Sequence, residues 1–163
     1  MLSSRALRTI VINVGTVLVI IVSIITANSI ARALAGLRLS GLLFSGIKLV
    51  GSTTFFISVA LASAIHRSFP PKHDRPEDFE RLYTEGPYQL CRHPFYFFLM
   101  LIQISIPLIF LSALGLLLAL AFIPLWYALA KVEEEELINY WDTMYLEYKK
   151  RVPMLIPLKL RRG

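Results

Sequence analysis

From Phe95 to Ala130 the chain runs for 36 residues without a charged side chain, and this segment constrains the fold more than any other feature. A helix rises about 1.5 Å per residue, and one membrane crossing needs about 20 apolar residues. The segment is too long for one crossing and predicts two short ones. We place the turn between Leu111 and Gly115, where a serine and a glycine favour a tight connection, with Pro107 and Pro124 as kinks within the two arms.

Two other apolar stretches precede this segment. One runs from about Thr9 to Ala31, and the other runs from about Leu42 to Ile65 with Lys48 as its one charge. The alternative for the first stretch is a secretory signal, but the apolar core of a signal has only about 7–15 residues, which favours an uncleaved membrane helix. Lys48 lies near the start of its stretch, so its flexible stem can reach the interface. The prediction is an all-α, polytopic membrane bundle of about four transmembrane helices.

Lysine and arginine are distributed unevenly over the connecting segments. With the N-terminus inside, the inner segments hold two near the N-terminus, five between Arg67 and Arg92 and seven from Lys131 onward. These fourteen compare with two outside, Arg32 and Arg38. A bias of this kind marks the cytoplasmic face, so we expect both termini there. It also explains the net charge of +6 without a nucleic-acid partner.

The composition agrees with a membrane protein. Apolar residues make up 56% of the 163 positions and charged residues 17%, whereas a soluble domain has about 25% charged residues. The length predicts one domain. Cys91 is the one cysteine, which excludes an intrachain disulfide, and the three histidines lack metal-site spacing, so we predict no metal.

Two polar segments fall on the predicted cytoplasmic side. In the first, Asp74 and Glu77 fit a capping box and predict a short helix that ends near Gly86. The second begins at Lys131 and predicts an amphipathic C-terminal helix. Its apolar face carries Leu137, Trp141, Met144, Tyr145 and Tyr148.

A hairpin over residues 95–130 would return both of its ends to the same side of the membrane. Arg92 and His93 would then meet the four glutamates 133–136 at the bilayer edge, although about forty positions separate them. Each piece alone has a plainer explanation, as an interfacial anchor, a solvated face or an aromatic belt. Their conjunction indicates a functional site with its charged groups on the cytoplasmic face.

Two motifs in this region resemble a known superfamily. The first motif consists of Gly86-Pro87-Tyr88, Arg92-His93-Pro94 and Tyr96, and the second of Glu133-Glu134-x-x-Leu137, Trp141, Tyr145, Tyr148 and Val152-Pro153. Together they resemble the isoprenylcysteine carboxyl methyltransferase and phospholipid N-methyltransferase superfamily of integral membrane enzymes. The resemblance covers nearly half of the chain, from about Thr84 to Pro157.

The resemblance implies S-adenosylmethionine as the cofactor, bound at the cytoplasmic membrane edge without a Rossmann domain. No G-x-G-x-x-G motif is present, which agrees. By residue match, the implied catalytic residues are Arg92 and Glu134. The implied cofactor-binding residues are Tyr88, His93, Pro94, Tyr96, Glu133 and Glu134. A single domain over residues 1–163 would then divide into two membrane helices, 1–65, and a cofactor-binding and catalytic part, 66–163.

Two departures from the superfamily pattern stand out. Many members have glycine where this chain has Phe98, which implies a shifted contact or a different pocket wall if that glycine admits the cofactor. Members also tend to have Phe-Gly where this chain has Trp141-Asp142. We expect Asp142 to be tolerated in an exposed helix.

The acceptor determines what chemistry the residues must perform. A carboxylate acceptor needs only a cation such as Arg92 to orient it, whereas an amine must first lose a proton, which His93 or a glutamate could accept. The C-terminal match favours carboxyl O-methylation of an isoprenylcysteine-type substrate. The alternatives are a phospholipid amine N-methyltransferase and a non-catalytic scaffold with the same fold. The expected partners are a lipophilic small molecule or prenylated substrate and membrane lipids, and the sequence predicts no particular oligomeric state.

Overall fold

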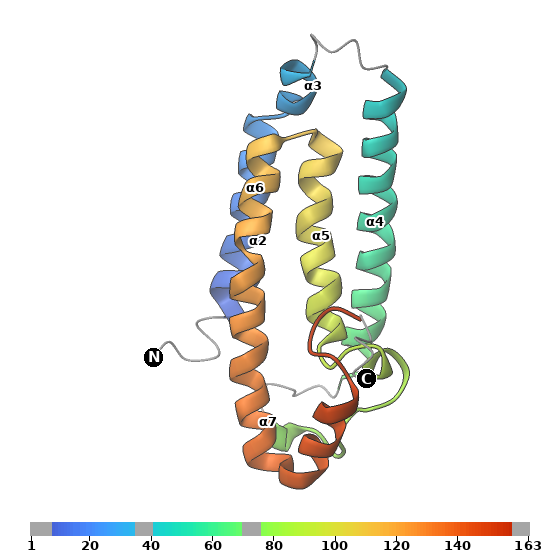
Figure 1. Cartoon of the computed structure of the whole chain (residues 1–163), viewed down its shortest axis with the longest axis vertical. Coiled ribbons are helices and arrows are strands. Elements are labelled where there is room, and N and C mark those ends of the chain that lie inside the picture. Colours follow the sequence, from blue (N-terminus) through green and yellow to red (C-terminus); the bar gives the residue numbers. More distant parts are fainter. Residues whose placement is uncertain (1–7, 35–40, 70–75, 158–163) are drawn as a thin grey trace.

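The computed structural model describes residues 8–34, 41–69 and 76–157, and within these ranges the chain forms helices and no β-strand. The long helices lie side by side along one axis (Figure 1). The loop between α4 and α5 and the end of α7 lie at the lower end of the bundle in this view. The predicted all-α bundle is therefore confirmed for the described residues.

The N-terminal helix begins as the π-helix η1 (Thr9–Val14) and continues as α2 (Gly15–Ile25). Its buried residues recur at every fourth position, as expected for one helix face. They are Val11, Gly15, Val19 and Ser23. The left-handed backbone of Asn28 (φ 59°) then separates α2 from the short helix α3 (Ser29–Ala33). The apolar stretch predicted as one helix is therefore interrupted near its end.

The second apolar stretch is the helix α4 (Gly41–Arg67), which packs along α5 (Pro94–Phe110). Gly51 permits this close approach. A Cβ atom at Gly51 would lie 2.9 Å from the Cβ of Leu108 and 3.0 Å from the backbone nitrogen of Ile109. Small residues at such contacts are typical of helix pairs in membranes.

The predicted turn in the long apolar segment is confirmed. α5 ends at Phe110, the following Leu111 has a left-handed φ of 49°, and α6 (Ala113–Ala121) begins after Ser112. The Ser112 hydroxyl accepts a hydrogen bond from the backbone nitrogen of Gly115 at 2.9 Å and so caps α6. The two arms therefore return to the same end of the bundle.

The helix α7 (Ile123–Arg151) follows α6 and joins the last apolar arm to the polar C-terminal segment. Pro124 lies in its first turn, where the missing N–H has little cost, so the proline marks a helix start rather than the predicted kink. The predicted helix from Lys131 is the second half of α7. Within it, Asp142 has non-helical φ 43° and ψ −120°, and the chain turns back there (Figure 1).

Three expectations for the polar segments were wrong. The predicted helix up to Gly86 is absent, because the described part of that segment holds only the 3-10 turns η3 (Pro76–Asp78) and η4 (Gly86–Gln89), while Asp74 lies outside the described residues. Met144 is 62% exposed, because the bend at Asp142 rotates it away from the face that Tyr145 and Tyr148 share. Asp142 itself is not in regular helix.

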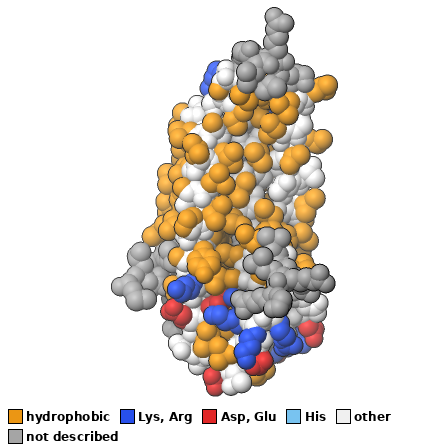
Figure 2. Space-filling view, viewed as in Figure 1, with side chains coloured by type: hydrophobic (Ala, Val, Ile, Leu, Met, Phe, Trp, Pro, Cys, Tyr) orange, Lys and Arg blue, Asp and Glu red, His pale blue; other side chains and the backbone are white. Residues whose placement is uncertain are grey.

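The surface separates apolar from charged side chains along the bundle. Figure 2 shows hydrophobic side chains over most of the visible length, with acidic and basic side chains gathered at the lower end. Among the residues that the structure describes, two helices are long and apolar enough to cross a membrane, residues 41–67 and 113–151. Two shorter apolar helices, residues 10–25 and 94–110, accompany them.

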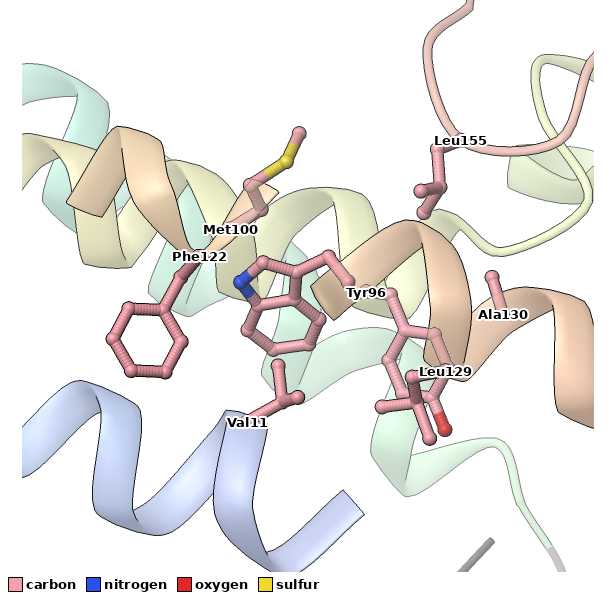
Figure 3. Packing of buried hydrophobic residues seen from close by; sticks show 8 residues of the cluster. Val11, Tyr96, Met100, Phe122, Leu129, Ala130 and Leu155 are labelled. Carbon is pink, nitrogen blue, oxygen red and sulfur yellow. The ribbon is translucent and has the colours of Figure 1, made fainter. Parts of the chain in front are cut away.

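A buried cluster near the charged end supports the loops there (Figure 3). Its members are Val11, Tyr96, Met100, Phe122, Trp126, Leu129, Ala130 and Leu155. The Trp126 indole Nε1 donates to Gln103 Oε1 at 2.8 Å, which satisfies a polar group in an apolar interior. Because Leu155 is buried here, the segment after α7 is anchored to the bundle.

Candidate active site

Arg92 and Glu134 meet where α5 begins and where α7 leaves its apolar part. Arg92 Nε donates to Glu134 Oε1 at 2.6 Å, and Lys149 Nζ lies 2.9 Å from the second oxygen of that carboxylate. The Arg92 side chain is 7% exposed and the Glu134 side chain 1%. Arg92 Nη1 also donates to the backbone carbonyl of Lys149 at 3.0 Å. The predicted meeting of Arg92 with the glutamates is confirmed.

The same arginine holds the segment after α7 in place. Its Nη1 donates to the backbone carbonyl of Val152. The backbone nitrogen of Arg92 donates to the carbonyl oxygen of Pro153 at 2.8 Å, and the backbone nitrogen of His93 donates to the carbonyl oxygen of Met154 at 3.0 Å. These bonds fix the start of α5 against the C-terminal segment. Three of the five N–H groups of the Arg92 guanidinium therefore donate to protein groups.

Glu133 is held by side chains from two other elements. The Tyr96 hydroxyl donates to Glu133 Oε1, and Arg8 Nη2 donates to the same oxygen at 2.6 Å. His93 Nδ1 lies 3.8 Å from Glu133 Oε2. The His93 ring also stacks on that of Tyr96, with 5.7 Å between the centroids and 1° between the planes. Glu133, on α7, thus has a defined position beside the start of the N-terminal helix.

The buried polar atoms without a hydrogen-bond partner among the described residues include His93 Nε2 and the Tyr145 hydroxyl. His93 Nε2 lies 3.6 Å from Glu134 Oε1, beyond hydrogen-bond distance. His93 and Tyr145 line the cavity described below. Buried polar groups in native proteins are nearly always satisfied, so a polar molecule bound here would complete them.

Glu134 is ionised by its surroundings. Burial alone would raise the pKa of its carboxyl, but the neighbouring His93 and Arg92, followed by Lys149, outweigh burial and lower the pKa to about 2. The group lies beyond the apolar part of α7. A carboxylate with this pKa is not suited to carry a proton near neutral pH.

Tyrosines from the bent end of α7 close another side of the site. The Tyr148 hydroxyl donates to the backbone carbonyl of Tyr88 at 2.6 Å, which joins the last turns of α7 to the η4 turn. Burial raises the pKa of the phenols of Tyr88, Tyr145 and Tyr148 above the usual value. These three groups are therefore neutral hydrogen-bonding groups.

These elements surround a cavity of about 320 Å³, which falls in the range of small-molecule pockets. One wall is a connected set of rings from the end of α4, the following loop and the start of α5. It consists of His66, Phe69, Phe79, Tyr83 and Phe95. The charged wall residues are Arg8, Arg81, Arg92, Glu133 and Glu136. The cavity therefore combines aromatic faces with charges of both signs.

Most of the residues singled out from the sequence line this cavity. They are Tyr88, Arg92, His93, Pro94, Tyr96 and Glu133. Glu134 does not belong to the lining and lies behind it, bound to Arg92. Phe98 is also absent from the lining.

Sequence reasoning missed two contributions to the site. Arg8 reaches it from the N-terminal helix, three positions before Val11, whose burial only the structure shows. The ring wall from His66 to Tyr83 had no sequence signal either, because it depends on the path of an irregular loop.

Most of the residues at this site lie in a segment that matches a known protein family. The family model for phospholipid methyltransferases matches residues 37–143. The chain belongs to this family. The matched range contains both motifs through Trp141 and ends at the α7 bend, so Arg8 and Tyr148 lie outside it.

Membership in this family indicates an integral membrane methyltransferase and confirms the superfamily suggested by the motifs. No curated protein and no solved structure matches the chain.

Proposed function

We propose that this protein transfers a methyl group from S-adenosylmethionine to a lipophilic acceptor at the membrane surface. The observation that carries the proposal is the cavity at the charged end of the bundle, which is lined by the motif residues of a methyltransferase family. S-adenosylmethionine supplies a methyl group already activated on a sulfonium. The protein must then position two molecules and exclude water, which can contribute roughly 7–11 kcal/mol in favourable cases.

The residues present suit this cofactor. It carries a sulfonium, an ammonium, a carboxylate and ribose hydroxyls, and the cavity offers partners for each kind of group. Carboxylates accept hydrogen bonds from an ammonium or a hydroxyl, and tyrosine faces attract cations by about 0.5–2 kcal/mol per contact. The proposed cofactor-binding residues are Tyr88, His93, Pro94, Tyr96 and Glu133. The unsatisfied His93 Nε2 and Tyr145 hydroxyl agree with a polar ligand.

For Arg92 and Glu134 we propose positioning roles in place of the catalytic roles that the resemblance implies, and for Glu134 also in place of the implied cofactor-binding role. Glu134 lies outside the cavity lining, and Arg92 is bound to Glu134 and to two backbone carbonyls. The pair holds α5, α7 and the C-terminal segment together, so that His93 and Glu133 keep their places on the wall.

The hydrogen bonds of Arg92 to protein groups also affect which methyl acceptor we propose. A carboxylate acceptor would need a cation to orient it, and Arg92, the cation expected for this task, is already bound to protein groups. An amine acceptor needs a proton acceptor, and His93, Glu133 and Glu136 all line the cavity. We therefore propose a lipid amine as the acceptor ahead of the isoprenylcysteine-type carboxylate. The exposed Arg81 on the wall is the feature that supports the carboxylate alternative.

The proposed topology has four crossings and one domain over residues 1–163. The N-terminal helix, α4, α5 and α6 with the first part of α7 are apolar enough in sequence for these crossings. The positive-inside bias then places the cavity and both termini on the cytoplasmic side. A lipophilic acceptor would reach the cavity sideways from the cytoplasmic leaflet.

The first experiment measures binding and transfer on the full chain in lipid nanodiscs. Calorimetry with S-adenosylmethionine is compared for the wild type, Glu133→Gln and Glu135→Gln. Glu135 is exposed on the same helix and serves as the matched control. We expect saturable binding by the wild type and the control, and at least ten-fold weaker binding by Glu133→Gln, as expected for a lost charge-assisted hydrogen bond.

The acceptor is then identified with methyl-labelled cofactor and two candidates, phosphatidylethanolamine and a farnesylated cysteine. Base releases the label from a carboxyl methyl ester but not from a methylated amine, so the two products are distinguishable. Base-stable label in the lipid supports the amine. Base-labile label on the cysteine supports the alternative. Folded wild-type protein without cofactor binding would overturn the proposal in favour of a non-catalytic scaffold.

A further inference from the structure

We propose that Arg8 is a positioning residue of the methyl-transfer site and acts through Glu133; this inference rests on the proposed function. Arg8 Nη2 donates to Glu133 Oε1 at 2.6 Å, and both residues line the cavity. The side chains are 31% and 15% exposed. Such a pair is partly shielded from water and differs from an exposed surface ion pair, which contributes little.

The N-terminal helix is built to hold Arg8 at this place. Three positions further along the helix, Val11 is fully buried in the cluster that contains Tyr96 and Trp126 (Figure 3). This packing anchors the start of the N-terminal helix against α5 and α7. The intervening turn is the π-helix η1, and single π turns within helices are frequent at functional sites.

Arg8 and Tyr96 both bind Glu133 Oε1, from two different helices. Two donors on one oxygen fix the rotamer of the carboxylate and leave Oε2 toward His93. An arginine remains charged at every relevant pH, so Arg8 donates to the carboxylate as a cation. Glu133 is thus oriented before a ligand binds, which reduces the entropy lost on binding.

This contribution lies outside the segment that matches the family model, which begins at residue 37. The N-terminal helix is therefore part of the functional unit and not only a membrane anchor. The division into residues 1–65 and 66–163 would cut through the site.

The test uses the full chain in nanodiscs and a double-mutant cycle. The variants are Arg8→Ala, Glu133→Gln and their combination, and Arg32→Ala is the matched control, because Arg32 is an exposed arginine on α3. Binding of S-adenosylmethionine is measured by calorimetry, and KM and kcat are measured with the acceptor found above. We expect Arg8→Ala to weaken binding about ten-fold and to raise the KM for the cofactor more than the KM for the acceptor.

If Arg8 acts through Glu133, the double variant binds no more weakly than Glu133→Gln alone, within about two-fold. Additive losses would show that Arg8 acts independently and would overturn the inference. Unchanged binding by folded Arg8→Ala would overturn it as well. Absence of cofactor binding by the wild type would instead reject the proposed function.

A second pair of substitutions, both with long polar side chains, covers the case in which Arg8→Ala does not fold. Arg8→Lys keeps the charge opposite Glu133 and should bind within about three-fold of wild type, whereas Arg8→Gln should lose about ten-fold. Equal binding by these two variants, each shown to be folded by thermal unfolding, would overturn the inference.

Discussion

Arg92 Nε and Glu134 Oε1 lie 2.6 Å apart and buried, although the two residues are 42 positions apart in the sequence. The turn at Leu111 and Ser112 brings them together, because it returns α6 and α7 to the end of the bundle where α5 begins.

Removing one partner of the buried Arg92–Glu134 pair should destabilise the protein more than replacing both partners with apolar residues. We expect Arg92→Ala to lower the free energy of unfolding by about 3–5 kcal/mol, because the buried Glu134 carboxylate would lose its partner at 2.6 Å. The double variant Arg92→Met/Glu134→Leu should lose less than the sum of the losses of Arg92→Met and Glu134→Leu. Denaturant titration in detergent measures these variants, Arg92→Ala and the wild type, and a strictly additive double variant would contradict the pairing.

Stability should depend on pH through Glu134. The pKa of this carboxyl is lowered from 4.5 to about 2, so its stabilising effect is complete above pH 4.5 and is lost as the pH falls toward 2. The full effect is on the order of 3 kcal/mol. We expect the melting temperature of the wild type to fall more steeply below pH 4.5 than that of Glu134→Gln. Parallel pH profiles for the two proteins would exclude this assignment.

Asp142→Gly should stabilise the protein. Asp142 has φ 43° and ψ −120°, a conformation that glycine adopts more easily than residues with a Cβ, and such strain costs of order 1–3 kcal/mol. We expect a gain of about 1 kcal/mol in the free energy of unfolding. The control is Asn139→Gly, an exposed position of α7 before the bend, where glycine should cost about 0.5 kcal/mol. Destabilisation by both substitutions would contradict strain at Asp142.

Gly51→Val should separate α4 from α5. A Cβ at Gly51 meets Leu108 at 2.9 Å, and the overlap should cost about 1–3 kcal/mol. Gly46→Val is the matched control on the same helix, because no atom lies within 4 Å of its added Cβ. Thermal unfolding in detergent compares the two variants. Equal melting temperatures would mean that the contact between the helices does not require glycine at position 51.

The hairpin and the site differ in how far the sequence could predict them. The turn at Leu111 and the meeting of Arg92 with the glutamates were predictable, because both follow from the length of an apolar segment. The identity of the glutamate on the cavity wall was not. Glu133 and Glu134 differ by about 100° around the helix, and only the packing of α7 places Glu133 on the cavity and Glu134 behind it.

By itself, the sequence determined an all-helical chain with long apolar segments, a hairpin and a cluster of motif residues at its base. These properties depend on local composition and spacing. The tertiary structure decided that Arg8 joins the site, that α7 bends at Asp142 and that Met144 points away from the face shared by Tyr145 and Tyr148. These three features depend on how helices rotate and pack against one another, and residues distant in the sequence set that packing.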